Sequence, residues 1–242
     1  MGELIAVLSG KGGTGKTSVC AGLATALAQA GQKVLCIDCD IGLRNLDISL
    51  GISQFGALSF SEVTAFDGEQ ALAHPKFPSL RFLTAPIGCL AEQVDTAHFF
   101  SLLQEARPQF DFIFLDAPAG IDAGFRLAAR GADRILLVTG ADPAAIRDAE
   151  RAGTELELMG KQQVRLIVNR IQPKMVQAMG LTVDDIMDRT GLPLLGVVPE
   201  DPRVMLSAAA GTPLLTLTRR GAVAACRRIA QRLLGHSVPI PL

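Results

Sequence analysis

The chain has 242 residues, of which 49% are hydrophobic, and a formal net charge of −1 at neutral pH. That length suffices for one α/β domain with a sizeable core, and the near-zero charge disfavours strong attraction of the whole protein to nucleic acid. No apolar run approaches the roughly 18 residues of a membrane span, and the N-terminus lacks the pattern of a signal peptide. The five cysteines lack the spacing of a disulfide framework, so we expect a cytoplasmic protein.

Short apolar runs alternate with segments of helical periodicity along the chain. The apolar runs predict strands at 4–8, 33–38, 80–84, 112–116, 134–139, 164–169 and 194–198. The helical patterns predict helices at 17–30, 97–106, 123–130, 143–159, 183–190, 202–210 and 222–234. Several strands are continuous runs of Val, Ile, Leu and Phe, which is typical of parallel strands buried on both faces. The pattern therefore predicts an α/β fold with a doubly wound, mostly parallel sheet and helices on both faces.

We expect a single domain over residues 1–242, ending in a short tail at 235–242 that contains two prolines. Gly31 fits the position after a helix end, and Pro143 fits the first turn of a helix. The segment 53–79 has the weakest pattern, and we expect one or two short helices there on the rim of the sheet. The three histidines, His74, His98 and His236, are scattered, and we expect them at the surface or in loops.

A glycine-rich loop with two lysines follows the first predicted strand. The segment Gly10-Lys11-Gly12-Gly13-Thr14-Gly15-Lys16-Thr17-Ser18 contains the phosphate-loop pattern G-x-x-x-x-G-K-T. Glycines let successive backbone N–H groups turn toward one anion, and the N-terminus of the following helix adds partial positive charge. The loop therefore predicts a nucleotide site, with Lys16 at the β- and γ-phosphates and the Thr17 hydroxyl on Mg²⁺.

Polar residues follow the other predicted strands at the edge where such sheets bind ligands. Asp38 and Asp40 come after the second strand, and carboxylates there can orient water or Mg²⁺. Asp116 ends the fourth strand, in the position of an aspartate that supports Mg²⁺. Asn169 follows the sixth strand and has an amide able to pair with the edge of adenine. Asp201 is either a ligand of the nucleoside or the N-cap of the next helix.

The run from Ser9 to Thr17 resembles the deviant Walker A loop of the ParA/MinD ATPases, and the segment Asp38–Asp47 resembles the switch I segment of the MinD branch of that family. The resemblance implies an ATP-dependent homodimer in which Lys11 reaches the phosphates of the partner subunit. It also implies that Asp40 polarises the attacking water, beside Lys11 and Lys16 as catalytic residues. The Asp116-Ala117-Pro118-Ala119-Gly120 segment resembles switch II, whose glycine N–H can sense the γ-phosphate.

The residue roles that the resemblance implies fall into three groups. Nucleotide binding is expected of Gly10, Lys11, Gly12, Gly13, Thr14, Gly15, Lys16, Thr17, Ser18, Asn169, Arg170, Pro199 and Asp201. Metal binding is expected of Thr17, Asp38 and Asp116, with Asp38 acting through water. Response to the nucleotide is expected of the switch residues Asp40, Arg44, Asn45, Asp47, Pro118 and Gly120.

The implied function is that of a Mg²⁺-dependent ATPase that places the division septum, with slow turnover stimulated by an activating or effector protein. One alternative is a ParA-type partition ATPase for a chromosome, plasmid or other cargo, which would bind DNA nonspecifically through arginine patches. A second alternative is a metabolic ATP-dependent ligase on the same fold. The chain departs from many family members at Thr14 and Ser18, where Val and Thr are usual.

The predicted last helix carries Arg227, Arg228 and Arg232 beside apolar residues. It is either packed on the sheet with its arginines in solvent or a basic amphipathic helix for anionic lipid. We expect the lysine- and aromatic-rich amphipathic tail of the MinD branch to be missing or much reduced here, which disfavours peripheral contact with the inner face of the membrane.

The cysteines give no sign of a metal or redox site. Cys36 and Cys39 form a C-x-x-C string, but residues three apart on a strand point to opposite faces. Cys89 and Cys226 are isolated, and no cysteine closely follows Asp116. This pattern disfavours the relatives of the same loop class that hold an iron–sulfur cluster.

Overall fold

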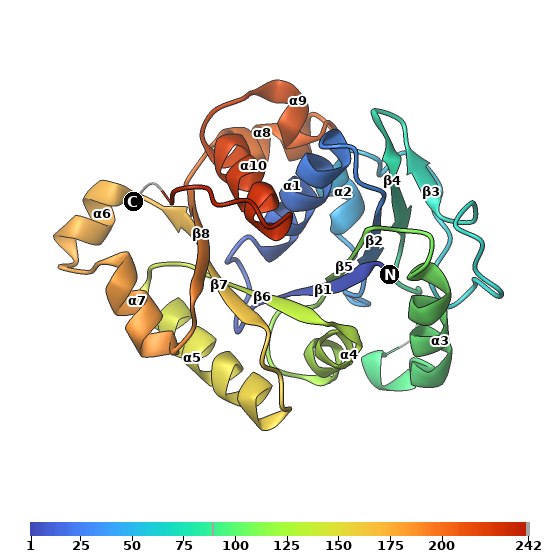
Figure 1. Ribbon diagram of the computed structural model, residues 1–242, viewed down its shortest axis with the longest axis horizontal. Helices are drawn as coiled ribbons and strands as arrows, with labels where there is room; N and C mark the ends of the chain where they lie inside the picture. The colour runs from blue at the N-terminus through green and yellow to red at the C-terminus, as the bar shows by residue number, and fades with distance from the viewer. Residues whose placement is uncertain (89, 241–242) are drawn as a thin grey trace.

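The computed structural model describes residues 1–88 and 90–240, so Cys89 and the last two residues of the predicted tail lie outside it. Within the described residues, eight strands form one sheet in the order β3-β4-β2-β5-β1-β6-β7-β8. Neighbouring strands pair in parallel except for the antiparallel pair β3–β4 at one edge. Helices cover both faces of the sheet (Figure 1), which confirms the predicted fold class.

The strands are β1 Glu3–Leu8, β2 Val34–Asp38, β3 Leu72–His74, β4 Phe77–Leu83, β5 Phe112–Asp116, β6 Arg134–Thr139, β7 Val164–Ile171 and β8 Leu194–Pro199. The helices are α1 Lys16–Gln29, α2 Leu46–Leu50, α3 Thr96–Ala106, α4 Ala123–Gly131, α5 Pro143–Leu158, α6 Pro173–Ala178, α7 Val183–Thr190, α8 Arg203–Ala209, α9 Leu214–Leu217 and α10 Ala222–Leu233, with a 3-10 helix η1 at Ala91–Gln93. Every predicted strand and helix forms, with ends displaced by at most three residues. The elements that the sequence pattern missed are β3, η1 and the helices α2, α6 and α9, which are too short for a clear periodicity.

The central strands bury both of their faces. Ile5 and Val7 of β1 belong to the apolar cluster beneath α1 and α10. Leu4 and Leu8 belong to the opposite cluster beneath α3, α4 and α5. Because successive side chains of a strand alternate between the faces, a strand between two helical layers needs apolar residues at nearly every position. This explains the continuous apolar runs of the sequence.

The local signals at the ends of two helices are confirmed. Gly31 follows α1 with a φ of 88°, and its N–H donates to Ala28 O at 3.0 Å. Gln32 N–H donates to Leu27 O at 3.1 Å, which completes a Schellman ending. Pro143 is in the first turn of α5, and the side chain of Asp142 caps that helix by accepting from Ala145 N–H. The two helices therefore end and begin where the sequence predicts.

The prediction of short helices within 53–79 is wrong. This segment contains β3 and the start of β4, and the short helix α2 precedes it. Phe60 and Phe66 are buried in the cluster below the sheet, where the Phe60 ring meets Phe99 edge-on at a centroid distance of 5.1 Å. These irregularly spaced phenylalanines fill space beneath the sheet edge from loop segments, so their burial does not require a helix.

The last helix packs on the sheet, as the first alternative predicts, but Arg227, Arg228 and Arg232 are only partly exposed and do not stand free in solvent. Val223, Ile229 and Leu233 are buried in the cluster that α10 shares with α1. Arg232 donates to Leu195 O, Val238 O and Pro239 O at 2.6–2.9 Å, which holds the following tail against the protein. No helix of the described residues combines the length and the apolar character that crossing a membrane would require.

His74 is buried, contrary to the surface position expected for it. Its Nδ1 accepts from Lys76 N–H at 3.0 Å and Phe77 N–H at 3.2 Å, so Nε2 carries the proton and donates to Leu50 O at 2.8 Å. The neutral ring thereby joins the β3–β4 turn to the end of α2. His98 is partly buried on α3 and His236 is exposed.

We expect His74 to make the stability of the protein fall in mild acid. Burial lowers the pKa of His74 from its ordinary value near 6.5, although the bond to Leu50 O opposes this. The unfolded chain therefore takes up the proton first, so the contribution is complete above about pH 6.5 and is lost as the pH falls toward the folded pKa. Urea unfolding of the wild type and His74→Gln from pH 8 to pH 5 measures this. The difference in unfolding free energy should shrink below pH 6.5, and a constant difference would contradict the assignment.

Candidate nucleotide-binding site

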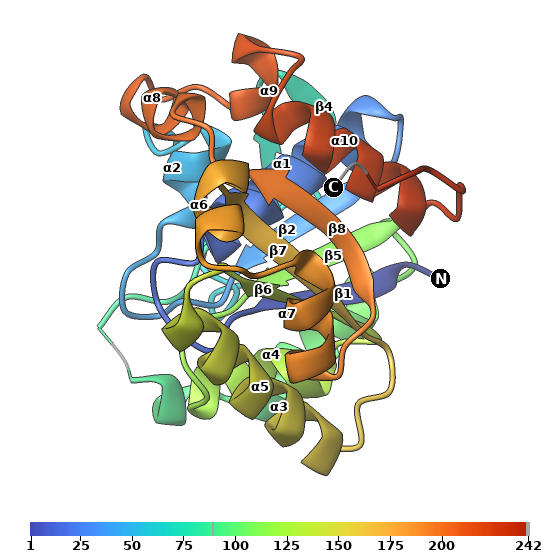
Figure 2. The same cartoon turned by 90° about the vertical axis from the view of Figure 1, so that its left-hand side faces the viewer.

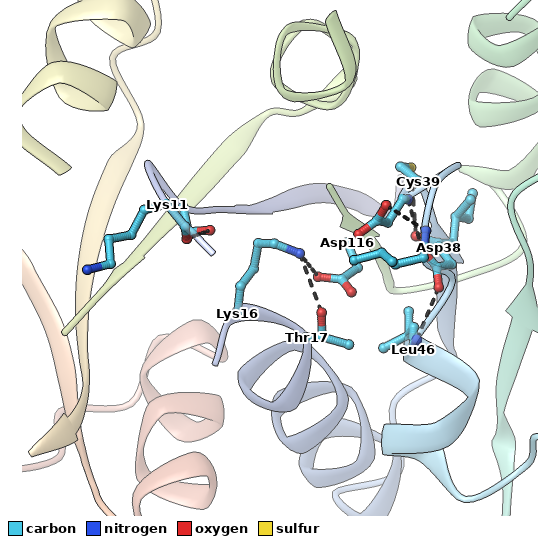
Figure 3. A network of polar contacts seen from close by, with 11 residues as sticks. Lys11, Lys16, Thr17, Asp38, Cys39, Leu46 and Asp116 are labelled. Atoms are coloured by element: carbon cyan, nitrogen blue, oxygen red, sulfur yellow. Dashed lines mark hydrogen bonds and ion pairs between the residues drawn. The ribbon is translucent and has the colours of Figure 1, made fainter. Parts of the chain in front are cut away.

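The phosphate loop joins β1 to α1 at the carboxyl edge of the parallel strands (Figure 3). Gly13 and Gly15 both have a φ of 81°, a left-handed conformation that glycine adopts without strain. A side chain at position 15 would also collide with the amide nitrogen of Asn169. Within the described residues, no side chain caps the N-terminus of α1, so its first N–H groups stay available to an anion.

Lys16 and Asp116 form a buried ion pair beside this loop. Lys16 Nζ donates to Asp116 Oδ1 at 2.8 Å, and the two side chains are only 7% and 1% exposed. Burial disfavours the Lys16 ammonium, but the adjacent Asp116 carboxylate outweighs it and raises the pKa of Lys16. Complete burial raises the pKa of Asp116, and Lys16 limits that rise. The cation thus compensates a carboxylate that water does not reach.

Asp38 lies next to Asp116, because the two residues are register partners at the ends of β2 and β5. Its two carboxylate oxygens accept from Asp40 N–H at 2.9 Å and Leu46 N–H at 3.1 Å (Figure 3). Burial and the neighbouring Asp116 carboxylate raise the pKa of Asp38 to about 7, although these two N–H bonds oppose the rise. Asp38 therefore anchors the loop that follows β2.

The structure brings the three predicted metal-binding residues together. Lys16 Nζ donates to both the Thr17 hydroxyl, at 3.4 Å, and Asp116, which in turn neighbours Asp38. Hydroxyl and carboxylate oxygens are the hard ligands that Mg²⁺ prefers, and two buried carboxylates facing one lysine leave uncompensated negative charge for it. The residues present therefore fit a Mg²⁺ ion.

The loop after β2 forms a tight turn. Asp40 Oδ1 accepts from Gly42 N–H and Leu43 N–H, both at 3.2 Å. Arg44 has a φ of 50°, and its Nε donates to Thr84 Oγ1 at 2.9 Å. Asn45 then precedes the first turn of α2, where Asp47 accepts from Ile48 N–H. Of the predicted switch residues here, Arg44 is therefore tied to the end of β4.

The loop after β5 is tied to the phosphate loop. Gly120 has a φ of 102°, and its N–H donates to Ser9 O at 3.1 Å. Pro118 packs so closely on Gly124 of α4 that a side chain at position 124 would overlap with the proline ring. The predicted switch residues Pro118 and Gly120 therefore connect the end of β5 to both α4 and the start of the nucleotide loop.

Lys11 points away from Lys16 (Figure 3). Its Nζ pairs with Asp142 at 3.1 Å, with 35% and 55% of the two side chains exposed. Exposed pairs of this kind contribute about 1 kcal/mol at most, so Lys11 can leave Asp142 at small cost. The sequence does not point to Asp142 as the partner of Lys11, because the Asp-Pro pair after β6 indicates only the start of a helix.

A cavity of about 180 Å³ lies beside the phosphate loop, and its lining includes Gly15, Ser18, Asn169, Arg170, Pro199 and Asp201. Asn169 Nδ2 donates to Thr14 O at 2.8 Å, and Arg170 donates to Gly13 O at 3.0 Å. Arg170 also pairs with Glu200 at 2.7 Å. The predicted nucleoside residues thus surround one cavity, and two of them support the phosphate loop.

Asp201 has a structural role as well as a place in this cavity. Its buried carboxylate accepts from Arg203 N–H at 3.1 Å, Arg203 Nε at 2.7 Å and Ala222 N–H at 3.0 Å. These bonds join the start of α8 to the start of α10. Helix α8 begins at Arg203, one residue later than the N-cap alternative predicts.

The strand geometry confirms the argument about the C-x-x-C string. Cys36 is buried in the cluster on the α1 side of the sheet, and Cys39 in the cluster on the opposite side. The two thiols therefore face away from each other across the sheet.

The fold and the loop define a P-loop nucleotide-binding protein, and the comparisons with known proteins agree. Residues 5–214 match the family model of the CobQ/CobB/MinD/ParA nucleotide binding domain. The septum site-determining protein MinD of Synechocystis is 38% identical over 99% of this chain and 92% of its own length. The MinD of Bacillus subtilis is 36% identical with the same coverage of both chains.

Solved structures lead to the same conclusion. MinD in the MinC:MinD cell division complex of Aquifex aeolicus has a TM-score of 0.90 and 35% identity, covering 99% of this chain and 98% of its own. MinD of Pyrococcus horikoshii complexed with Mg-ADP has a TM-score of 0.79 and 26% identity, covering 96% of both chains. The chain belongs to the MinD family of ATPases, which act in septum site determination.

We expect the two lysines of the loop to differ in their effect on stability. Lys16→Ala leaves the Asp116 carboxylate buried without its cation, which should lower the unfolding free energy by about 3 kcal/mol at pH 8. Lys11→Ala removes an exposed pair and should lower it by less than about 1 kcal/mol. The loss in Lys16→Ala should diminish as the pH falls and Asp116 takes up a proton. Urea unfolding measures both variants, and equal losses would contradict the burial argument.

Proposed function

We propose that this chain is a Mg²⁺-dependent ATPase that dimerises on ATP and thereby regulates where the division septum forms. The arrangement of the two lysines carries the proposal, because Lys16 lies in the site with Asp116 while Lys11 points out of it. The septum site-determining relatives and the Mg-ADP complex of the Pyrococcus horikoshii relative support it. The reaction is hydrolysis of ATP to ADP and phosphate.

Each group at the site has a role in phosphoryl transfer to water. Lys16 moves from Asp116 to the β- and γ-phosphate oxygens, where its charge stabilises the transition state. Thr17 and Asp116 would hold Mg²⁺ directly, and Asp38 would contact it through water. When bound, Mg²⁺ neutralises the charge that develops on the phosphate oxygens. The free N–H groups at the start of α1 bind the same oxygens.

Asp40 orients the attacking water from the loop after β2. The water oxygen forms a bond to the γ-phosphorus as the bond from that phosphorus to the leaving β-phosphate oxygen breaks, and the proton of the water passes to the Asp40 carboxylate. The bonds of Asp40 to Gly42 N–H and Leu43 N–H at 3.2 Å are long enough to be exchanged for this water. Gly120 N–H is the candidate contact to the γ-phosphate from switch II.

Lys11 completes the site of the partner subunit. Its weak, exposed pair with Asp142 leaves the lysine free to reach across a two-fold axis to the partner's phosphates. Hydrolysis removes the γ-phosphate that both subunits contact, so the two subunits then separate. We therefore expect slow ATP turnover by the monomer, since its site lacks the lysine that the partner subunit supplies.

A further protein stimulates or reads this cycle. The Aquifex aeolicus relative is in a complex with the cell division protein MinC, which supports an effector of that kind for this chain. The ParA family ATPase of Chlorobium tepidum, at 21% identity and a TM-score of 0.80, supports the shared fold alone. A net charge of −1 disfavours the alternative of nonspecific DNA binding. We place the protein in the cytoplasm.

We expect Lys11→Ala to keep ATP affinity within about threefold, since Lys11 is not in its own subunit's site, and to lose ATP-dependent dimerisation. Its hydrolysis rate should fall by at least about 100-fold, as for other cations supplied in trans. Fluorescent-nucleotide titration, sedimentation velocity and phosphate release measure the three quantities. The matched control is Lys33→Ala, which alters an exposed lysine directly before β2. Unchanged hydrolysis in Lys11→Ala would refute the action in trans.

We expect no ATP-dependent binding of residues 1–242 to anionic vesicles through α10. The apolar residues of this helix are buried against α1, so inserting them in lipid would expose the core. Vesicle co-sedimentation with ATP and with ADP measures this, with Lys16→Ala as the control that lacks nucleotide. ATP-dependent sedimentation that Lys16→Ala abolishes would instead establish a membrane-binding surface that the ATP state forms.

A further inference from the structure

We infer that Arg170 and Glu200 are positioning residues for the phosphate loop, whose N–H groups they orient through the carbonyl oxygen of Gly13. This deepens the proposed function, since it rests on nucleotide binding at that loop but not on the dimer or on septum placement. Arg170 lies near the end of β7, and Glu200 directly follows β8. Figure 2 shows β8 in front, at the edge of the sheet that faces the viewer.

An irregularity at the end of β7 directs two consecutive side chains to the same loop. Between two register pairs, β7 has Asn169 and Arg170 where β8 has only Val198. A regular strand points consecutive side chains to opposite faces, whereas an extra residue in one strand changes the direction of its side chains. Both side chains consequently reach the phosphate loop, where Asn169 donates to Thr14 O and Arg170 to Gly13 O.

The backbone of Arg170 has a conformation that most side chains avoid. Its φ is 58°, in the left-handed region that is uncommon for residues other than glycine. Such conformations persist only where the surrounding contacts hold them, and they are concentrated at functional sites. Here the N–H of Glu200 donates to Ile171 O at 3.0 Å, directly after the irregularity. Glu200 therefore holds this segment through its backbone as well as through its carboxylate.

The guanidinium group of Arg170 is shared between the loop and Glu200. Its Nη1 donates to Gly13 O at 3.0 Å, while Nε and Nη2 donate to the Glu200 carboxylate at 2.7 Å and 3.4 Å. An arginine side chain without partners samples many rotamers, and ordering it costs conformational entropy. The two contacts with Glu200 fix the plane of the guanidinium, so that Nη1 stays directed at Gly13 O. Glu200 thus acts on the loop through Arg170.

The two bonded carbonyl groups fix the direction of two N–H groups. In a planar trans peptide, the C=O bond points opposite to the N–H bond of the next residue. Because the carbonyls of Gly13 and Thr14 point to β7, the N–H groups of Thr14 and Gly15 point away from it. Among residues 1–88 and 90–240, neither of these N–H groups donates to a backbone oxygen. They are therefore oriented in advance for phosphate oxygens, which the N–H groups of such loops bind.

The stability of the fold gives little reason for this ion pair. The side chains of Arg170 and Glu200 are 55% and 28% exposed, and exposed pairs of this kind contribute little to stability. A second pair, Arg126 with Glu155, has the same N–O distance of 2.7 Å and a similar exposure of 46% and 24%, but it joins α4 to α5. This second pair supplies a matched control.

The main test measures the affinity for Mg-ADP by isothermal titration calorimetry. Arg170→Ala loses the bond to Gly13 O, so its dissociation constant should rise at least about 10-fold. Glu200→Ala lets Arg170 turn away and should raise the constant about fivefold, while Glu200→Gln keeps one acceptor and should recover part of this loss. The control Glu155→Ala should bind as the wild type does. The melting temperature without nucleotide should change by no more than about 3 °C in every variant.

A double-mutant cycle tests whether Glu200 acts through Arg170. In the Arg170→Ala background, Glu200→Ala should change the Mg-ADP constant by less than about 1.5-fold, because the residue that it positions is already absent. Fully additive losses would mean that Glu200 acts on the site independently, which would overturn the inference.

Inorganic pyrophosphate separates a role at the phosphates from a role at the nucleoside. Its affinity is measured with Mg²⁺ present, by displacement of a fluorescent ADP analogue. Arg170→Ala and Glu200→Ala should weaken pyrophosphate binding by the same factor as ADP binding. A loss for ADP with unchanged pyrophosphate binding would assign the two residues to the nucleoside and exclude the positioning role.

The outcomes distinguish this inference from the proposed function. If the wild type binds neither Mg-ADP nor pyrophosphate, the proposed nucleotide site fails and the positioning role fails with it. If the wild type binds both and Glu200→Ala binds them equally well, the nucleotide site stands and the positioning role of Glu200 is wrong.

Discussion

The buried ion pair between Lys16 and Asp116 is the interaction on which the nucleotide site depends. It forms because β1 and β5 are parallel neighbours, so the phosphate loop after one strand meets the aspartate that ends the other. Without the lysine, Asp116 and its neighbour Asp38 would bring two carboxylates together in a region that water does not reach. The negative charge of this site is therefore compensated only when a cation lies beside the carboxylates, either the Lys16 ammonium or a bound metal ion.

This requirement links the chemistry to the loops around it. Lys16 can turn to a phosphate only if something else compensates Asp116, which is the role that Mg²⁺ fills. Asp38 holds the loop after β2 with both of its oxygens, while Gly120 holds the loop after β5 against Ser9. A change of charge at Asp38 therefore acts directly on the loop after β2 through these two hydrogen bonds.

The sequence was sufficient for the framework and for the residues that gather at the carboxyl edge of the sheet. Buried parallel strands have an unmistakable apolar pattern, and the loop from Gly10 to Thr17 has its own signature. The sequence could not reveal the pair of Lys11 with Asp142, since the two residues are far apart in the chain and each has a local explanation. It also could not reveal that His74 is buried or that Phe60 fills space beneath the sheet edge, because irregular segments derive their structure from distant contacts.

One feature of the phosphate loop constrains how this sequence can vary. The backbone at Gly15 lies so close to the Asn169 amide that any side chain at position 15 would displace it. Asn169 in turn holds Thr14 O, and both Gly15 and Asn169 line the cavity for the nucleoside. A smaller residue at position 169 would remove this collision at the cost of a bond that supports the loop, but the left-handed backbone of Gly15 would still strain any side chain. Position 15 should therefore tolerate no residue other than glycine during evolution, whereas position 169 can change on its own, with loss of the bond to Thr14 O.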